Sequence, residues 1–89
     1  MLSGIYKIKN TINGKFYIGS SFNVNKRKRE HYYKLNNNIH HCKYLQNSWN
    51  KYRQENFTFE IIAKCPVEYL IKLEDYFIKQ LKPQYNTAP

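Results

Sequence analysis

The sequence is poor in acidic residues. Only six Asp and Glu accompany fifteen Lys and Arg, which gives a net charge of +9. This imbalance favours a polyanionic partner such as nucleic acid, because lysine and arginine displace the counterions that surround phosphates. An anionic membrane surface is a weaker alternative, since no long basic helix carries an uninterrupted apolar face. The charge alone also fits a soluble basic protein that has no nucleic-acid role.

Cysteine is also scarce, and long apolar runs are absent. Cys42 and Cys65 are far apart, neither belongs to a Cys-x-x-Cys pair, and no signal peptide precedes them, so we expect a reducing, intracellular setting. His40, His41 and Cys42 are adjacent and would need Cys65 or His31 as a fourth ligand. Adjacent side chains rarely point at one metal, so we expect no structural zinc site. No apolar run is long enough to span a bilayer, and we expect a soluble protein.

The first two dozen residues predict a β-hairpin. Asn13-Gly14 lies between two β-prone runs, and a type I′ turn needs positive φ at both central residues, which Asn-Gly tolerates. This turn predicts three cross-strand pairs: Ile12 with Lys15, Asn10 with Tyr17, and Ile8 with Gly19. Because side chains alternate with a period of two, Tyr6 and Tyr17 then share one face with Gly19, which leaves open space beside them.

The remaining patterns predict one α+β domain over residues 1–89, without repeats or a linker. Its order is ββααβα, with a three-stranded, mainly antiparallel sheet flanked by three helices. The expected elements are strands Ser3–Asn10 and Lys15–Ser20, helices from about Val24 to Leu35 and over Lys43–Tyr52, strand Phe57–Lys64, a helix from Pro66 to about Leu81, and an irregular tail over 84–89.

Charged residues occupy positions of the first predicted helix where apolar ones are expected. Val24 and Leu35 define an apolar stripe at helical spacing, and Arg27, Lys28 and His31 fill it between them. A row of charges on a helix is usually a solvated face. Here Arg27 and His31 are neighbours at the edge of the core-facing stripe, where a partner or substrate would satisfy them.

The last predicted helix carries a carboxylate in its apolar face. Glu74 lies four residues after Leu70 and four before Ile78, and such a position is costly unless a cation or hydrogen-bond donors meet the carboxylate. One explanation is a structural pair with an arginine or lysine, and the other is a ligand for a hard divalent cation. His40 has no comparable placement, and we expect it to be exposed in or just after a turn.

These residue types suit phosphodiester hydrolysis. The reaction needs a base for the attacking water, a cation for the phosphorane and a metal at the leaving oxygen. Tyrosine is a poor base at its ordinary pKa of about 10. Nearby cations such as Arg27 or a metal ion would lower that pKa.

The chain resembles the GIY-YIG nuclease superfamily, especially the catalytic domains of phage group I intron homing endonucleases. Gly4-Ile5-Tyr6 and Tyr17-Ile18-Gly19 match both halves of the signature. Further matches follow in order along essentially the whole chain: Arg27, His31, His40, Glu74 and Asn86. Either triplet alone is a weak signal, but the complete ordered set is highly specific.

The resemblance implies a DNA endonuclease that depends on Mg²⁺ or Mn²⁺, with one ion on Glu74. Tyr6, as a phenolate or through a hydrogen-bond relay with His31, would activate water, and Arg27 would bind the scissile phosphate. Tyr17 would orient the water or the phosphate, although the choice of base between the two tyrosines stays open. His40 would help to position or protonate, and Asn86 would support the local geometry.

Homing endonucleases of this branch continue into a linker and a separate DNA-binding region. We therefore expect either the catalytic domain of a longer protein or a small stand-alone nuclease. Candidates for contacts with DNA phosphates that do not read bases are Lys26, Lys28, Lys34, Lys43 and Lys51. Alternatives are a structure-selective repair nuclease, a DNA-binding module without catalysis, and a basic domain with a structural Glu74–Arg27 pair. We expect a monomer without an organic cofactor, in the cytoplasm of a host or bacterial cell.

Overall fold

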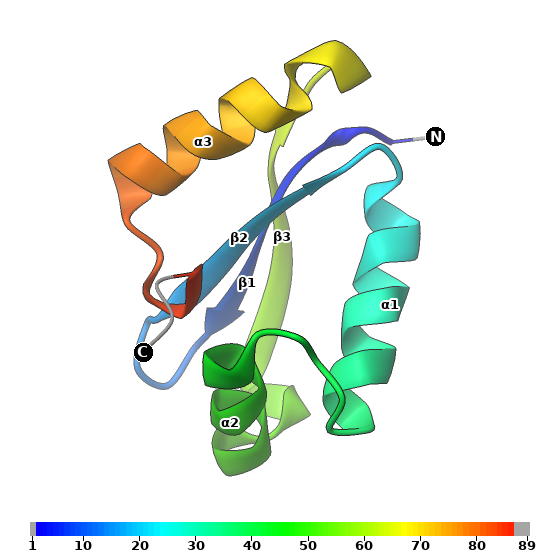
Figure 1. Cartoon of the computed structure of the whole chain (residues 1–89). Coiled ribbons are helices and arrows are strands. Elements are labelled where there is room, and N and C mark those ends of the chain that lie inside the picture. The colour runs from blue at the N-terminus through cyan, green and yellow to red at the C-terminus, as the bar shows by residue number, and fades with distance from the viewer. Residues whose placement is uncertain (1, 87–89) are drawn as a thin grey trace.

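The computed structural model describes residues 2–86, which fold into a three-stranded sheet with helices on both of its faces (Figure 1). The elements follow the predicted order ββααβα: β1 (Gly4–Asn10), β2 (Phe16–Ser21), α1 (Val24–Asn36), α2 (Lys43–Tyr52), β3 (Phe57–Lys64) and α3 (Leu70–Leu81). Both strand pairings are antiparallel, and β1 lies in the centre of the order β2-β1-β3. The predicted α+β fold class is confirmed.

The hairpin register differs from the prediction by two residues. Tyr6 pairs with Gly19 and Ile8 pairs with Tyr17, so the predicted pairs were wrong. Gly14 has a φ of +77°, but Asn13 does not adopt a positive φ, which excludes the two-residue type I′ turn. The connection instead spans 11–15, and the side chain of Asn10 accepts the Ile12 amide at 2.9 Å. A shift of two preserves the faces, so Tyr6, Tyr17 and Gly19 still lie on one side of the sheet.

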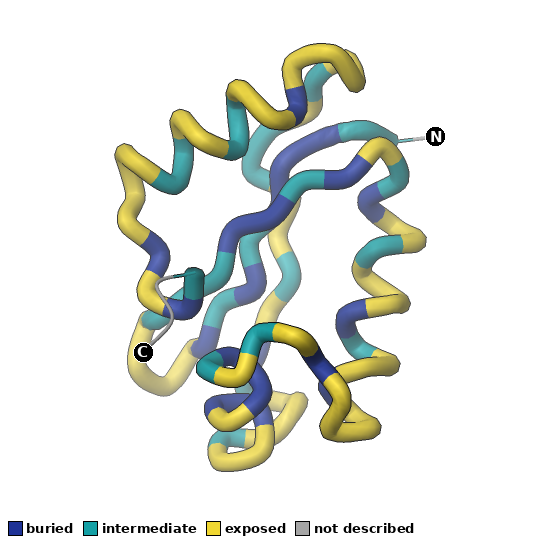
Figure 2. Tube along the Cα trace, viewed as in Figure 1, coloured by how far each residue is buried: buried dark blue, intermediate teal, exposed yellow. Residues whose placement is uncertain are grey.

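The two faces of the sheet bury separate apolar clusters. Figure 2 shows that buried positions are frequent along β1 and β2. On one face, Tyr6 and Ile8 pack with Leu35 of α1 and with Leu45 and Trp49 of α2. On the other face, the buried side chains come from β1, β2 and α3: Ile5, Ile18 and Leu70. Because β2 is an edge strand, groups on α1 and α3 can meet around its free side.

Local signals explain the helix bounds. Asn23 caps α1, since its side chain accepts the Lys26 amide at 3.2 Å. The expected bounds of α2 and β3 agree with the structure. Pro66 does not open α3 directly, because a 3₁₀ turn over Val67–Tyr69 comes first and α3 starts at Leu70.

The end of the chain is more ordered than the sequence predicts. Lys82 ends α3 in the left-handed region with a φ of +51°. A 3₁₀ turn over Gln84–Asn86 follows, so the prediction of an irregular tail was wrong for these residues, and 87–89 lie outside the described part. Within residues 2–86, no helix is both long and apolar enough to cross a bilayer, and Cys42 and Cys65 are free thiols.

Candidate active site

A buried hydrogen-bonded chain joins β1, α1 and the connection between α1 and α2. The Tyr6 hydroxyl lies 2.6 Å from Nε2 of His31, and Nδ1 of His31 lies 2.7 Å from Nε2 of His40. His31 is 4% exposed and His40 is 1% exposed. The prediction that His31 faces the core is therefore confirmed, whereas the prediction that His40 is exposed was wrong.

The backbone determines which ring nitrogens of this chain carry protons. The Cys42 amide donates to Nδ1 of His40 at 3.0 Å, so the proton of the neutral His40 ring is on Nε2. Nε2 of His40 then donates to Nδ1 of His31, which leaves the His31 proton on Nε2. The Tyr6 oxygen therefore accepts from His31, and the Tyr6 proton is free to bond to a water or a substrate.

Burial keeps this chain uncharged at neutral pH. Loss of hydration, followed by the neighbouring His40, lowers the pKa of His31 to about 3. Loss of hydration, followed by the neighbouring His41, lowers the pKa of His40 to about 4. Burial, and next the nearby Tyr17, raises the pKa of Tyr6 well above its usual value, while the Arg27 charge opposes this rise.

Gly19 makes room for the Tyr6 ring. A Cβ atom added at Gly19 would overlap the phenol ring and hydroxyl of Tyr6, so only glycine fits beneath this side chain. Tyr6 fills the space that the sequence analysis expected to stay open. The second glycine of the signature thus has a steric reason: it lets the Tyr6 hydroxyl cross the edge strand.

Tyr17 lies beside the chain without joining it. Its ring is edge-on to His31, with 5.6 Å between ring centroids, and to His40, with 6.3 Å. Burial raises the pKa of Tyr17 to about 12. Among the described residues its hydroxyl has no hydrogen-bond partner, whereas Tyr6 accepts from His31. The two tyrosines share a face as predicted, but their hydrogen bonding differs.

Arg27 and Glu74 meet at Ser20 of the edge strand. An Nη1–H of Arg27 donates to the Ser20 carbonyl at 3.5 Å, and the Ser20 hydroxyl donates to the Glu74 carboxylate. Arg27 also pairs with Glu30, with 3.1 Å between Nε and Oε1. The described residues therefore do not form the structural Glu74–Arg27 pair that was one alternative.

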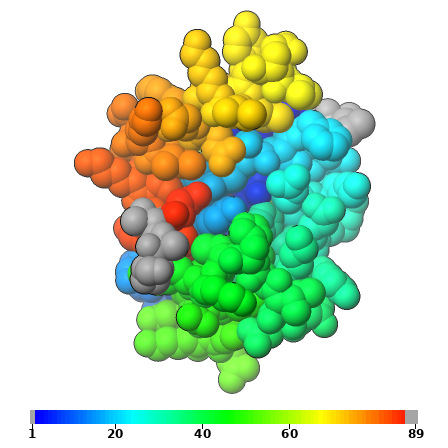
Figure 3. Space-filling view, viewed as in Figure 1, coloured from blue at the N-terminus to red at the C-terminus, as the bar shows by residue number. Residues whose placement is uncertain are grey.

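Glu74 reaches this place from the opposite side of the sheet. α3 packs on the face of Ile5 and Ile18, while Tyr6 and His31 lie on the other. The groups of the site therefore do not all lie on the sheet face of Tyr6 and Tyr17, and they gather around the free edge of β2. Figure 3 shows this region hollowed, with the blue atoms of the strands visible between α1, α2 and α3.

The Glu74 carboxylate suits a hard divalent cation that is shared with a substrate. Glu74 is half-buried, and among the described residues only one of its oxygens has a hydrogen-bond donor. Within residues 2–86, no group of three or more His, Cys, Asp or Glu side chains could hold a metal ion. Mg²⁺ commonly binds through one or two carboxylates, waters and substrate phosphates, so a single carboxylate fits this ion.

Asn86 supports the edge strand. Its side-chain oxygen accepts the Ile18 amide and its side-chain nitrogen donates to the Ile18 carbonyl, both at 2.8 Å. These bonds occupy the backbone groups that an edge strand otherwise leaves unpaired. Asn86 thus holds the strand segment that carries Tyr17 and Gly19.

The three predicted DNA-contacting lysines of α1 point in different directions. Lys34 lines the hollow in front of Tyr6 and also, together with Lys26, a separate hollow on the outer side of α1. The Lys28 ammonium lies over the rings of Tyr32 and Phe59, at 5.7 Å and 5.6 Å from their centroids. The prediction that Lys28 fills the apolar stripe was wrong, because Lys28 is exposed.

Sequence reasoning missed Ser20 and the backbone amide of Cys42. Ser20 directly follows the second triplet, and the period of two places it on the face opposite Tyr17, which could have indicated a contact with α3. A backbone amide carries no signal in sequence. Its contact with His40 depends on the path of the connection between α1 and α2.

Comparisons with known proteins agree with this geometry. Residues 2–86 match the family model described as the GIY-YIG catalytic domain. Intron-associated endonuclease 1 of Enterobacteria phage T4 is 39% identical over 88 residues, which cover 97% of this chain and 36% of that protein. A Neurospora crassa protein named probable intron-encoded endonuclease bI1 is 33% identical, over 96% of this chain and 20% of its own length. The chain thus spans about a third of the first relative and a fifth of the second.

Solved structures extend the agreement to three dimensions. The catalytic domain of homing endonuclease I-TevI superposes with a TM-score of 0.84 and 36% identity, covering 90% of this chain and 88% of that one. A mutant of the catalytic domain of intron endonuclease I-TevI gives a TM-score of 0.88 and 35% identity, over 100% of this chain and 93% of the other. The chain therefore belongs to the GIY-YIG family of endonuclease catalytic domains.

Proposed function

We propose that the chain hydrolyses phosphodiester bonds of DNA with the help of Mg²⁺, or Mn²⁺ in its place. The observation that carries this proposal is the convergence around the free edge of β2. A buried tyrosine with a hydrogen-bond donor, an arginine and a half-buried carboxylate come together there, and Ser20 links the last two. These are the groups that hydrolysis of a phosphodiester requires.

Tyr6 is the better general base of the two tyrosines. Its oxygen accepts from Nε2 of His31, and this bond would stabilise a phenolate. His31 cannot take the Tyr6 proton while Cys42 and His40 hold the chain in its tautomers, so that proton would leave to solvent before reaction. Burial raises the Tyr6 pKa and opposes this loss, and the nearby positive charge of Arg27 favours it. The phenolate then removes a proton from the attacking water, whose oxygen bonds to phosphorus as the bond to the leaving oxygen breaks.

Arg27, directly, and Glu74, through a bound cation, would compensate the negative charge that develops on the phosphate during the reaction. The Arg27 guanidinium lines the same hollow as Tyr6 and compensates the negative charge that grows on the phosphoryl oxygens. Glu74 would hold the divalent cation, which supplies electrophilic stabilisation of the phosphate and the leaving oxygen when bound. Tyr17 borders the same hollow and would orient the water or the phosphate.

The relatives supply the biological context of the proposal. Because the phage T4 and Neurospora proteins carry intron endonuclease names, we propose a homing-type activity for the protein that contains this domain. The domain would act as a monomer on DNA in the cytoplasm of a host or bacterial cell, in agreement with its free cysteines. High sequence specificity would then come from other parts of such a protein.

Nicking of a supercoiled plasmid tests the proposal. We expect the wild type to cut with Mg²⁺ and to be inactive in EDTA. Glu74→Ala and Arg27→Ala should each lose about 10³-fold in cleavage rate, because each removes a group that compensates transition-state charge. An Arg27→Ala protein that cuts at the wild-type rate would contradict the mechanism.

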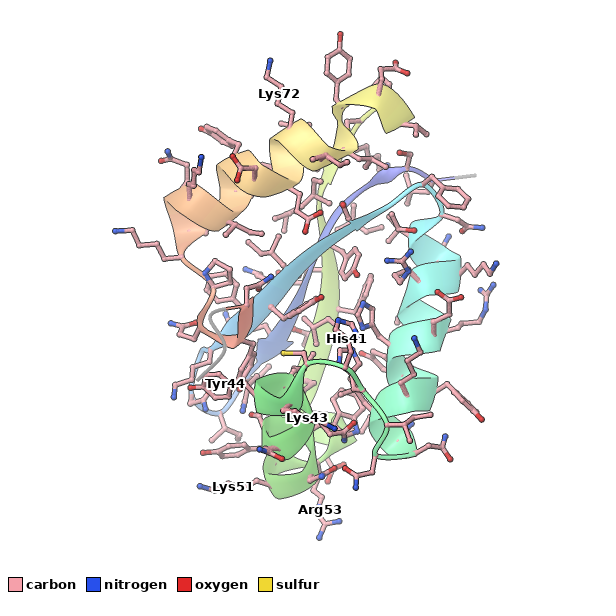
Figure 4. The ribbon with its side chains drawn as sticks, in the orientation of Figure 1. His41, Lys43, Tyr44, Lys51, Arg53 and Lys72 are labelled. Carbon is pink, nitrogen blue, oxygen red and sulfur yellow. The ribbon has the colours of Figure 1, made fainter. Side chains whose placement is uncertain are left out.

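Thermal unfolding of the same variants separates catalysis from folding. Glu74 and Arg27 are only partly buried, so both variants should unfold within a few degrees of the wild type. Lys72→Ala is the matched control, since Lys72 projects from α3 away from the site (Figure 4). It should keep full activity. If Glu74→Ala instead melts the domain and its folded fraction keeps its activity, Glu74 is a structural residue.

A further inference from the structure

The charge of this chain is unevenly distributed along the sequence. Eleven of the fifteen Lys and Arg residues lie before Glu55, together with only one of the six acidic residues, Glu30. The part of the chain that forms β1, β2, α1 and α2 is therefore strongly basic. The other five acidic residues lie in β3, in α3 and in the 3₁₀ turns Gln54–Asn56 and Val67–Tyr69. A polyanion should bind on the side of the molecule that the first part builds.

A groove leads from the active site across the start of α2 to the loop between β1 and β2. The hollow in front of Tyr6 and Arg27 shares Tyr17 and His41 with a second hollow, and the second shares Tyr44 and Tyr85 with a third. We call the second and third hollows together the α2 groove. None of the described residues that line it is Asp or Glu.

The α2 groove has a basic and aromatic lining, made of three lysines, one histidine and two tyrosines: Lys15, Lys43, Lys51, His41, Tyr44 and Tyr52. Figure 4 shows His41 in the connection before α2, Lys43 and Tyr44 at the start of α2, and Lys51 further along this helix. The three lysines Lys15, Lys43 and Lys51 therefore all line the α2 groove, which begins at the catalytic hollow.

The aromatic rings of the groove hold lysines in place. The Lys15 ammonium donates to the Tyr44 hydroxyl at 2.9 Å and lies 5.5 Å from the centroid of the same ring. Lys51 lies 5.2 Å from the centroid of Tyr52, and Tyr44 packs edge-on against Tyr85. The ammonium groups held beside these rings suit phosphates, which carry no sequence information.

The outer side of α1 is less suited to the same partner. The hollow there is lined by Lys26, Arg29 and Lys34, but also by Glu30. Arg27 already pairs with Glu30, and Lys28 lies over two rings on the side of β3. Positive charge on α1 is thus partly compensated and divided between two directions, whereas the α2 groove is continuous and free of carboxylates.

We propose that the α2 groove binds the phosphate backbone of the cut DNA strand on one side of the scissile phosphate. The proposal rests on the proposed endonuclease function, because the groove starts at the catalytic hollow. It assigns the contacts to Lys15, Lys43 and Lys51, in preference to the lysines of α1. These contacts add affinity for DNA of any sequence and leave the chemical step unchanged.

Binding without cleavage provides the first test. Fluorescence anisotropy in EDTA measures the affinity for a labelled duplex at several salt concentrations. A Lys15→Gln, Lys43→Gln, Lys51→Gln triple variant should bind about tenfold more weakly at low salt, and its plot of log affinity against log salt should be shallower by about 2.7. Lys72→Gln removes one positive charge from α3, outside the groove, and should bind like the wild type. A Lys43→Arg, Lys51→Arg variant keeps the charge of the groove and should also bind like the wild type.

Cleavage of truncated duplexes provides the second test. We expect the triple variant to raise KM about tenfold with unchanged kcat on a long duplex. The second substrate is a duplex shortened on the side that occupies the groove. On it, the KM of the wild type should rise about tenfold over its value on the long duplex, whereas the KM of the triple variant should rise little further. If the triple variant binds and cuts like Lys72→Gln, the groove is not the DNA path.

The two proposals fail in different ways. If the wild type does not cut but the triple variant still loses affinity and salt dependence, the endonuclease proposal fails, and with it the placement of the groove beside a scissile phosphate, while binding of DNA phosphates by the three lysines is supported. If the wild type cuts and shortening either side affects wild type and triple variant equally, the groove proposal fails alone. Thermal melting of each variant confirms that the folded protein is being compared.

Discussion

On the α1 side of β2, His31 and His40 are buried and bonded in a chain that ends at Tyr6, whereas on the α3 side Glu74 is half-buried and bonded to Ser20. The first group already has its hydrogen bonds satisfied, and burial keeps it neutral. The second keeps a carboxylate oxygen available for a ligand. The protein thus fixes the part of the site that moves protons and leaves open the part that would bind a cation and substrate.

The largest expected effect is a loss of folding stability at acidic pH, caused by the buried histidines His31 and His40. Between about pH 6.5 and 4, the unfolded chain binds protons at His31 and His40 that the folded chain does not, so stability falls as pH falls. The loss should be about 1.4 kcal/mol per pH unit for each histidine. Urea unfolding across this range measures the slope.

Variants test whether the slope of unfolding free energy against pH comes from the buried histidines on the α1 side of β2. His40→Gln keeps an amide donor toward His31 and should remove about half of the slope. Glu74→Gln on the other side should keep the full slope. His41→Gln removes only the second cause of the lowered His40 pKa and leaves burial in place, so it should keep most of the slope. Equal slopes for the wild type and His40→Gln would show that the buried chain does not control acid stability.

Filling the space under Tyr6 should have the next largest effect. Gly19→Ala places a methyl group where the Tyr6 ring lies, and such overpacking costs about 2 kcal/mol. The folded fraction should also lose cleavage activity, because the Tyr6 hydroxyl is displaced from His31. Urea unfolding and plasmid nicking measure the two effects.

Gly14→Ala is the control for Gly19→Ala. Gly14 has a φ of +77°, but a Cβ there meets no atom within 4 Å, so alanine strains the loop without touching the site. It should lower stability and leave the specific activity of the folded protein unchanged. If Gly19→Ala also keeps its specific activity, Tyr6 is not the base.

Removing the link between the two sides should have the smallest effect. Ser20→Ala deletes the hydroxyl that bonds to Glu74 but keeps the carbonyl that accepts from Arg27. Stability should change by less than about 0.5 kcal/mol, while the Mg²⁺ concentration for half-maximal cleavage rises by about tenfold. An unchanged Mg²⁺ dependence would mean that Ser20 does not position Glu74, and Ser20→Thr should restore the wild-type value.

Local signals predicted the elements well because they act over a few residues. Asn23 caps α1 as its side chain predicted, and the bounds of α2 and β3 agree with their patterns. The hairpin register was wrong because Asn10 accepts the Ile12 amide and favours a longer loop than Asn13-Gly14 suggested. Asn13-Gly14 is compatible with a two-residue turn and with the observed connection over 11–15. Only the packing of the strands decides which of the two forms.

The sequence by itself determined that Tyr6, Tyr17 and Gly19 share a face, since a strand alternates with a period of two in either register. It also determined that His31 faces inward and that Glu74 interrupts an apolar stripe, since both follow from helical spacing. Tertiary structure alone decided that His40 is buried, that the Cys42 amide sets the proton positions, and that Glu74 arrives around the edge of β2. The physical reason is range: periodicity acts within one element, whereas these contacts join residues that only the packed sheet and helices bring together.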